Sequence, residues 1–177
     1  MRSRAKAVNF GIVYGIGAFS LAKDIGVSNK EAKHYIESYL AHYSGVDSYM
    51  KNVVEKANAD GYVETMFGRR RNLPELTSSK HMIRAFGERV ARNMPIQGTA
   101  ADIIKIAMIK VDERMKAENL RARLVLQVHD ELIVEAPQDE SMRVALIVQE
   151  EMENAVKMSV PLTADAAIGR TWYDAKG

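Results

Sequence analysis

A strip of cationic and aromatic side chains near the start of the chain constrains its fold most strongly. Arg2, Lys6, Phe10 and Tyr14 recur at every fourth residue. In a helix this spacing places successive side chains on one broad face. Cations followed by flat rings can hold a polyphosphate at one end and a sugar and base at the other. The spacing therefore predicts a helix over residues 2–14 with a nucleotide-binding face, and an ordinary amphipathic helix is the alternative.

The charges are divided unevenly along the chain. Residues 1–92 contain 15 Lys and Arg against 9 Asp and Glu, whereas residues 93–177 contain 10 against 14. A basic first half suits phosphates, and an acidic second half suits metal ions or plain solvation. The chain has no cysteine, which excludes disulfides, zinc–thiolate sites and cysteine nucleophiles. We expect a cytoplasmic protein without a membrane partner, because there is no bilayer-length apolar run and no secretory signal.

Helical spacing also predicts three helices in the first half of the chain. Ser28 and Glu31 have the spacing of a capping box, which marks a helix start. The helices are expected at residues 19–25, 29–43 and 46–59. The buried faces of the second and third of these helices are predicted to contain Tyr35, Ile36, Tyr39 and Leu40, and Tyr49, Met50, Val53 and Val54.

A cluster of arginines follows the turn of a predicted hairpin. Residues 61–74 have the pattern of two strands that turn near residues 67–68. Arg69–Arg71 come next, and alternation along a strand puts cations on both faces. A solvated charge run is the ordinary explanation of such a cluster. We favour phosphate contact, since the cluster accompanies a candidate nucleotide-binding helix.

A polar strip is predicted on a long helix over residues 80–119, which is expected to bend or break near Pro95. Arg89, Asn93 and Gln97 are four residues apart and therefore share a face. Arginine and amide side chains can reach the acceptor atoms of the minor groove, which are purine N3 and pyrimidine O2. The strip is a candidate DNA contact, and a solvated helix face is the alternative.

A second hairpin is predicted over residues 124–136, where two apolar, β-branched runs flank a polar tip. The tip carries His129, Asp130 and Glu131, which would lie exposed at one end of the ribbon. Acidic residues in a turn are most often ordinary turn chemistry. The rest of the chain is expected to form a helix and then a strand, at residues 139–158 and 161–168.

Several of these segments resemble motifs of the family A DNA polymerases, of the bacterial DNA polymerase I type. The first helix is similar to motif B of the family through Arg2, Lys6, Phe10, Tyr14 and Gly15. The tip of the second hairpin resembles motif C through His129, Asp130 and Glu131. The arginine hairpin, residues 93–102 and the closing segment with Trp172 and Tyr173 also resemble the family, with Asn72 where a tyrosine is common. The resemblance covers essentially the whole chain.

The resemblance implies an α+β fold that is incomplete relative to a full polymerase. Residues 1–78 would be part of a mainly helical fingers subdomain, and residues 79–177 part of a palm with a small antiparallel sheet. The implied activity is DNA-directed DNA synthesis in replication and repair, in which a nucleotidyl group passes from a dNTP to a primer 3′ end. The implied partners are primer-template DNA and dNTP, and the implied cofactor is Mg²⁺, with two ions in the complete enzyme.

The resemblance also assigns roles to single residues. Arg2 and Lys6 would bind the β- and γ-phosphates of the dNTP, and Lys6 could also give a proton to the leaving pyrophosphate. Phe10 would pack on the deoxyribose, and Tyr14 would stack at the insertion site. The residues expected to contact DNA are Arg71, Arg89, Asn93, Gln97 and His129. Asp130 would be the catalytic metal ligand, with Glu131 as a secondary one and His129 orienting the primer 3′ end.

Motif A of the family, which carries another metal-binding aspartate, would precede motif B. We therefore expect this sequence to be a cut through a larger protein whose first turn frays, leaving Arg2 poorly fixed. A two-ion site needs more carboxylates than Asp130 and Glu131 supply, so the chain alone is expected to be inactive. An incomplete palm sheet would also favour a homodimer, domain swapping or low stability.

Three alternatives belong to other classes of function. The chain could be a non-catalytic nucleic-acid-binding module, or a structural fragment that binds nothing tightly. A hydrolase that uses His129 and Asp130 ranks last, because no serine or cysteine nucleophile stands in a recognisable motif.

Overall fold

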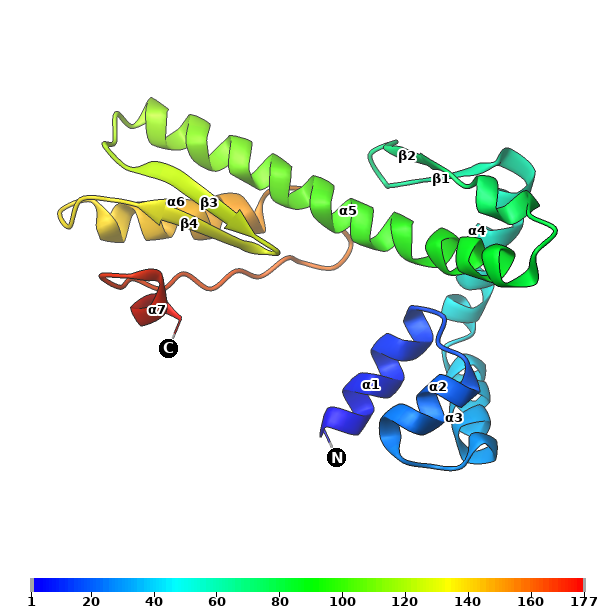
Figure 1. Cartoon of the computed structure of the whole chain (residues 1–177). Coiled ribbons are helices and arrows are strands. Elements are labelled where there is room, and N and C mark those ends of the chain that lie inside the picture. The colour runs from blue at the N-terminus through cyan, green and yellow to red at the C-terminus, as the bar shows by residue number, and fades with distance from the viewer. Residues whose placement is uncertain (1, 177) are drawn as a thin grey trace. The chain divides into compact units, whose positions relative to one another are not determined.

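The chain has an α+β fold, which a computed structural model describes for residues 2–176 (Figure 1). The side chains of residues 2–4 and 7 lie outside this description. The chain forms two compact units, residues 1–99 and residues 100–177, that divide within one long helix. The assignment of residues 1–78 and 79–177 to functional subdomains stays a prediction. No helix among the described residues is both long enough and apolar enough to cross a membrane.

Four helices form the first part of the first unit, and local sequence signals set their ends. Ser28 accepts a hydrogen bond from the Glu31 amide while the Glu31 carboxylate accepts one from the Ser28 amide, so the predicted capping box is confirmed. The second helix ends at Ile25, as predicted, and its C-cap Gly26 is left-handed with φ 69°. The helices are α1 (Arg2–Val13), α2 (Ala18–Ile25), α3 (Asn29–His42) and α4 (Ser44–Asp60).

Small and aliphatic side chains make the contacts between α2 and α3. Leu21, Ile25 and Ala32 are buried together, and Val8 of α1 packs against them. The prediction that Tyr35 and Tyr49 are buried is wrong, since they remain 46% and 41% exposed. A tyrosine hydroxyl favours solvent, so helical spacing alone does not require the ring to be buried.

The arginine hairpin forms as predicted and packs on two helices. Its strands are β1 (Tyr62–Glu64) and β2 (Arg70–Asn72), which pair antiparallel, and the 3₁₀ turn η1 (Pro74–Thr77) follows. Their core consists of Ala57, Val63, Leu73, Leu76 and Ala91, from α4, the hairpin, η1 and α5 (His81–Ala117).

Of the bend or break expected near Pro95, the break does not occur: α5 runs without interruption from His81 to Ala117. Proline removes one backbone hydrogen bond from a helix interior, at a cost of about 3 kcal/mol. Ala91 and Thr99, one turn to either side, are both buried. Packing on both sides of the proline therefore offsets its cost and keeps the segment helical.

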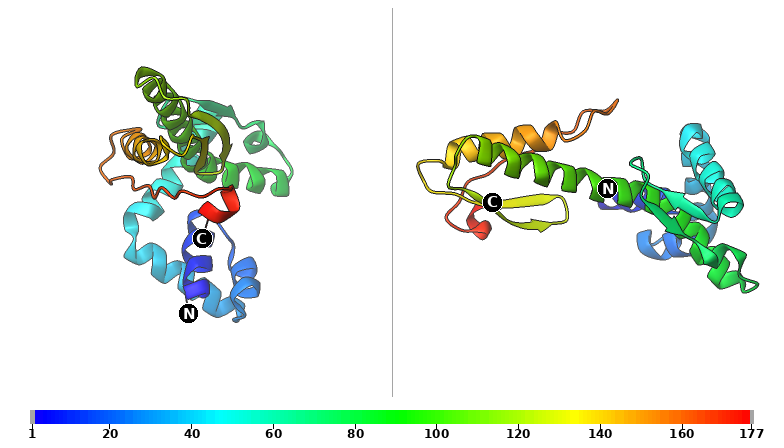
Figure 2. Two further views of the ribbon diagram at one scale, coloured as in Figure 1. Left: turned by 90° about the vertical axis from the view of Figure 1, so that its left-hand side faces the viewer. Right: turned by 90° about the horizontal axis from the view of Figure 1, so that it is seen from above.

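The second unit pairs a hairpin with a helix. The strands β3 (Arg123–Val128) and β4 (Glu131–Glu135) are antiparallel, and α6 (Ser141–Glu153) and the short α7 (Trp172–Ala175) follow. Figures 1 and 2 show α6 and the hairpin alongside the part of α5 that belongs to this unit. The core between them is formed by Val111, Met115, Val144 and Ile147.

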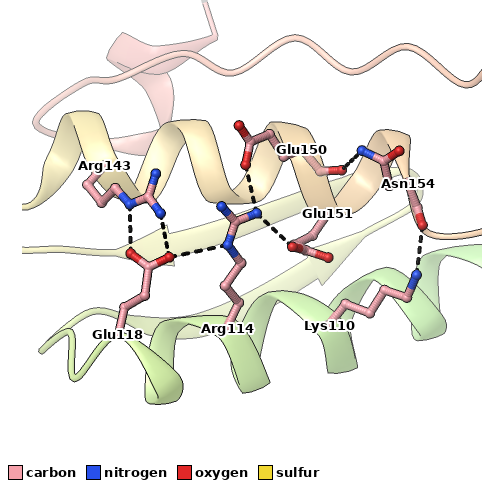
Figure 3. A network of polar contacts seen from close by, with 7 residues as sticks. All are labelled: Lys110, Arg114, Glu118, Arg143, Glu150, Glu151 and Asn154. Carbon is pink, nitrogen blue, oxygen red and sulfur yellow. Dashed lines mark hydrogen bonds and ion pairs between the residues drawn. The ribbon is translucent and has the colours of Figure 1, made fainter.

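An ion-pair network joins α5 and the residue that follows it to α6 (Figure 3). Arg114 lies 2.7 Å from both Glu150 and Glu151 and 3.3 Å from Glu118. Arg143 donates a hydrogen bond of 2.6 Å from Nε to Glu118. The hydrogen bond from Arg143 holds the pKa of Glu118 below its ordinary value, and hydrogen bonds to Glu151 and Glu150 raise the pKa of Arg114.

Two predictions for the C-terminal part need correction. The helix predicted over residues 139–158 is shorter, at Ser141–Glu153. The strand predicted over residues 161–168 is absent, and these residues form no ladder with any described strand. A strand exists only when a neighbour pairs with its backbone. In this segment the Ala164 amide donates instead to the Glu153 carboxylate, at 3.1 Å.

Candidate functional site

The described side chains of the predicted strip, those of Lys6, Phe10 and Tyr14, lie next to one another along α1 and the residue that follows it. Lys6 Nζ lies 5.8 Å from the centroid of the Phe10 ring, and the rings of Phe10 and Tyr14 stack with centroids 6.2 Å apart. Phe10 is 50% exposed, so its ring is not part of the core. The predicted role of Arg2 concerns a side chain outside the described residues. A cation beside an exposed ring and a half-buried one can receive a phosphate and a flat or sugar group together.

The hairpin places its arginines in different environments. Arg70 lies 3.2 Å from Glu64 and stacks over the Tyr62 ring at 4.5 Å. Arg71 is exposed and pairs across the sheet with Val63. Cross-strand partners point to the same face, so Arg71 lies on the face of the hairpin that carries the buried Val63, opposite to Arg70. Among the described residues no ion pair occupies Arg71, which leaves it available for an anion.

The polar strip of α5 is partly accessible. Arg89 and Gln97 are exposed, and the Arg89 guanidinium lies 5.9 Å from the centroid of the Phe86 ring. Asn93 is half-buried, and its Oδ1 has no hydrogen-bond partner among the described residues. An unpaired acceptor at such a depth is uncommon in folded proteins.

The end of α1 lies against this strip, which the sequence did not reveal. Gly15 is left-handed with φ 76°, and a Cβ added to it would lie 3.4 Å from Cδ of Arg92 and 4.0 Å from Cγ of Arg89. Arg92 itself pairs with Glu88 at 3.4 Å. Arg92 was therefore missed as a neighbour of the α1 strip. Its position three residues after Arg89 is the signal that could have placed it on the same side of α5.

The tip of the second hairpin carries the predicted acidic residues. His129 is left-handed with φ 54°, an uncommon conformation for a residue other than glycine, and its carbonyl accepts a hydrogen bond from Gln127. Asp130 is exposed, and Glu131 begins β4. The turn therefore presents Asp130 and Glu131 next to each other at the end of a packed ribbon.

A cation near the C-terminus reaches this tip. Lys176 Nζ lies 3.4 Å from Glu131 Oε2 and 4.8 Å from the centroid of the Trp172 ring. Asp130, Glu131, Trp172 and Lys176 all line a half-open cavity of about 780 Å³ in the second unit. Lys176 was not predicted as a site residue, because its contact joins residues far apart in the sequence.

The acidic tip fits part of a magnesium site. Carboxylate oxygens are the ligands that Mg²⁺ prefers, and the ion keeps several waters and substrate oxygens besides one or two carboxylates. Asp130 and Glu131 supply such oxygens, and among the described residues no group of three or more His, Asp or Glu side chains is placed to hold a metal.

Comparison with known proteins gives consistent matches along the chain. The family model of DNA polymerase family A matches residues 1–174. DNA polymerase I of Bacillus caldotenax is 55% identical over 176 residues, and that of Bacillus subtilis (strain 168) is 53% identical over 176 residues. Each alignment covers 99% of this chain and 20% of the relative, so the chain spans about a fifth of the length of the curated relatives it matches.

A solved structure is similar to the chain as well. It is the POL domain of Pol1 from M. smegmatis in complex with DNA primer-template and dNTP, with 46% sequence identity and a TM-score of 0.95. The similarity covers 99% of this chain and 31% of that chain. The expected homodimer receives no support from these comparisons.

Proposed function

Because the chain belongs to DNA polymerase family A, we propose that it takes part in template-directed DNA synthesis, as a piece of a larger DNA polymerase I that works in bacterial replication and repair. The reaction transfers a nucleotidyl group from a dNTP to a primer 3′ end. The observation that carries the proposal is the contact of Lys6 with the exposed Phe10 on α1, and of Phe10 with Tyr14 directly after the helix.

The α1 strip binds the incoming nucleotide in this proposal. The Lys6 ammonium pairs with the β- and γ-phosphates together with Arg2, and it gives a proton to the departing pyrophosphate. Phe10 packs on the deoxyribose, which its 50% exposure permits. Tyr14 stacks where the new base pair forms.

The cations and amides of the first unit hold the primer-template. Arg71 contacts the backbone of the template, since its face of the hairpin is free of the Glu64 ion pair. Arg89, Asn93 and Gln97 contact the minor groove, where arginine and amide groups meet the N3 and O2 acceptors.

The acidic tip holds metal in the second unit. Asp130 would ligate Mg²⁺, with Glu131 as a secondary ligand, and His129 would orient the primer 3′ end. Two magnesium ions in the complete enzyme would lower the barrier by neutralising the charge that develops on the attacking and leaving oxygens. Lys176 keeps one oxygen of Glu131 in an ion pair, which favours Asp130 as the principal ligand.

We further propose that the 177 residues alone do not extend a primer. A two-ion site needs carboxylates on both sides of the reacting phosphate. Asp130 and Glu131 are adjacent residues and supply one side. The test is primer extension with dNTP and Mg²⁺ by this chain and by a longer polypeptide that includes it. Extension by the longer protein alone is expected, and extension by this chain would refute the metal argument.

A non-catalytic DNA-binding role is the second candidate, favoured by the basic residues of the first unit. The two candidates differ in the effect of metal on nucleotide affinity. If the chain binds dNTP in a Mg²⁺-dependent way and Lys6→Ala weakens this binding, the polymerase role is supported. If the chain binds DNA but has no nucleotide affinity, the alternative is supported. Sedimentation of the same samples tests whether the chain forms a homodimer.

A further inference from the structure

The turn of the arginine hairpin is fastened to α5 by buried threonines. The Met66 amide donates a hydrogen bond of 3.1 Å to Thr99 Oγ1. Thr65, directly after β1, is only 4% exposed, and Thr99 is 7% exposed. We call Thr65, Met66, Gly98 and Thr99 the hairpin latch. It joins residues that are 33 positions apart in the sequence.

Gly98 allows this close approach. A Cβ at this position would lie 2.6 Å from Cγ2 of Thr65, a separation that real Cβ atoms essentially never show. Gly98 lies inside α5, where glycine is unfavourable compared with alanine. Its backbone is not left-handed, so the conformation does not require glycine. The space beside Thr65 therefore explains why glycine occupies this position.

The same threonine also shapes the turn that leads to the arginines. Thr65 Oγ1 accepts hydrogen bonds from the amides of Phe67 and Arg69, each at 3.2 Å. These bonds fix the backbone between β1 and β2. On the helix side of the latch, Gln97 directly precedes Gly98. The latch thus lies between the arginine-bearing hairpin and the polar strip of α5.

We propose that the hairpin latch positions Arg71 relative to Arg89, Asn93 and Gln97, so that Arg71 contacts the backbone of the same stretch of DNA whose minor groove the three strip residues contact. This inference rests on the proposed DNA-binding role of the first unit. The latch side chains are positioning residues, since the buried Thr65 and Thr99 do not themselves reach DNA. A loosened latch leaves every charge in place but lets the hairpin move away from the strip. The chain then contacts fewer phosphates at the same time.

Four variants separate the latch from general packing. Gly98→Ala closes the space beside Thr65, and Thr99→Val removes the acceptor of the Met66 amide while keeping a side chain of similar shape. Thr99→Ser keeps the acceptor and is expected to behave as the wild type. Gly45→Ala is the matched glycine control, because Gly45 lies inside α4 and an added Cβ there meets nothing within 4 Å.

Two measurements on the full chain test the proposal. Hydrogen exchange of the Met66 amide reports on the latch without DNA, and affinity for a primer-template duplex as a function of salt reports on phosphate contacts. Each lost phosphate contact lowers the slope of log affinity against log salt by about 0.9. We expect the hydrogen-exchange rate of the Met66 amide to rise by about tenfold or more in Gly98→Ala and Thr99→Val. We also expect them to lower the salt slope by about one contact.

The outcomes distinguish the latch from the proposed function. A wild-type chain that binds no duplex at any salt concentration refutes the DNA-binding role and the latch role with it. Wild-type binding together with faster Met66 exchange but unchanged slopes in both variants refutes the latch role alone. Slopes that also fall for Thr99→Ser or Gly45→Ala refute it too. If Gly98→Ala fails to fold, Thr99→Val still gives both readings.

Discussion

Arg70 and Arg71 are neighbours in the sequence and should nevertheless contribute to different properties. Arg71 lies on the hairpin face of Val63, whereas Arg70 pairs with Glu64 at 3.2 Å and stacks over Tyr62 at 4.5 Å. We predict that Arg71→Ala weakens binding to primer-template DNA and that Arg70→Ala mainly weakens the fold. The pair is a matched comparison, because each change removes one guanidinium from the same strand.

The expected magnitudes follow from these contacts. Loss of one phosphate contact lowers the salt slope by about 0.9, so the advantage of the wild type over Arg71→Ala should shrink by about 3.5-fold when salt rises about fourfold. Arg70→Ala should change the slope less, since Glu64 already neutralises its charge locally. An exposed ion pair contributes about 0.2–1 kcal/mol and an exposed cation–π contact about 0.5–1 kcal/mol, so Arg70→Ala should lower the free energy of unfolding by about 1 kcal/mol. An exposed substitution such as Arg71→Ala should change it by less than about 0.5 kcal/mol.

Fluorescence anisotropy with a labelled primer-template, titrated at several salt concentrations, measures the slope. Denaturant unfolding of the same variants measures the free energy of unfolding. The reasoning is refuted if both variants lower the slope equally, because the ion pair with Glu64 would then not matter for DNA contact. It is also refuted if Arg71→Ala destabilises the fold more than Arg70→Ala.

Three further predictions concern the second unit. Ile147→Ala, in a fully buried position, should lower the free energy of unfolding by about 2–5 kcal/mol, whereas Leu146→Ala on the exposed side of α6 should cost far less, and urea unfolding of both variants checks this. The pKa of Glu118 is lowered in the folded chain, so its ionised carboxylate stabilises the fold at pH values above the ordinary carboxyl pKa of 4.5. This stabilisation is lost as the pH falls through the folded pKa. Glu118→Gln should therefore flatten the acid limb of a plot of melting temperature against pH. Lys176→Ala removes the cation 3.4 Å from Glu131 and should tighten Mg²⁺ binding, which calorimetry measures. A change in the free energy of unfolding above about 1 kcal/mol would show a larger structural role for this exposed ion pair.

Local chemistry made much of the fold predictable from the sequence. The Ser28 capping box, the stop at Gly26 and both hairpins depend on residues within a few positions of each other. The failures concern tertiary neighbours. The segment 161–168 is apolar enough for a strand but has no pairing partner among the described strands, and burial of Ala91 and Thr99 keeps α5 helical through the expected break.

The candidate site divides in the same way. Helical spacing was enough to predict that Lys6, Phe10 and Tyr14 share one face, and Phe10 contacts each of the other two. No spacing could place Arg92 beside Gly15 or Lys176 beside Glu131, because those contacts depend on how distant elements pack. Sequence motifs thus located residues that share one element, and the structure added the cations that other elements bring to them.

A last prediction follows from the division of chemistry between the units, with cations and rings in the first and the exposed acidic tip in the second. Asp130→Asn removes a carboxylate charge without changing the size of the side chain much. It should weaken Mg²⁺ binding, and it should not weaken metal-free DNA binding, because the lost charge is one that repels phosphate. Lys6→Ala should leave Mg²⁺ binding intact and weaken dNTP binding.

Glu135→Gln is the matched control for Asp130→Asn, since Glu135 lies at the other end of β4 and pairs with Arg123 at 2.9 Å. It should leave Mg²⁺ binding unchanged. Calorimetry with Mg²⁺ and anisotropy with DNA in the presence of a chelator give the two readings for each variant. If Asp130→Asn weakens metal-free DNA binding as much as Arg71→Ala does, the acidic tip contributes to DNA binding through structure and not through a metal. The assignment of Asp130 as a ligand would then lose its physical basis.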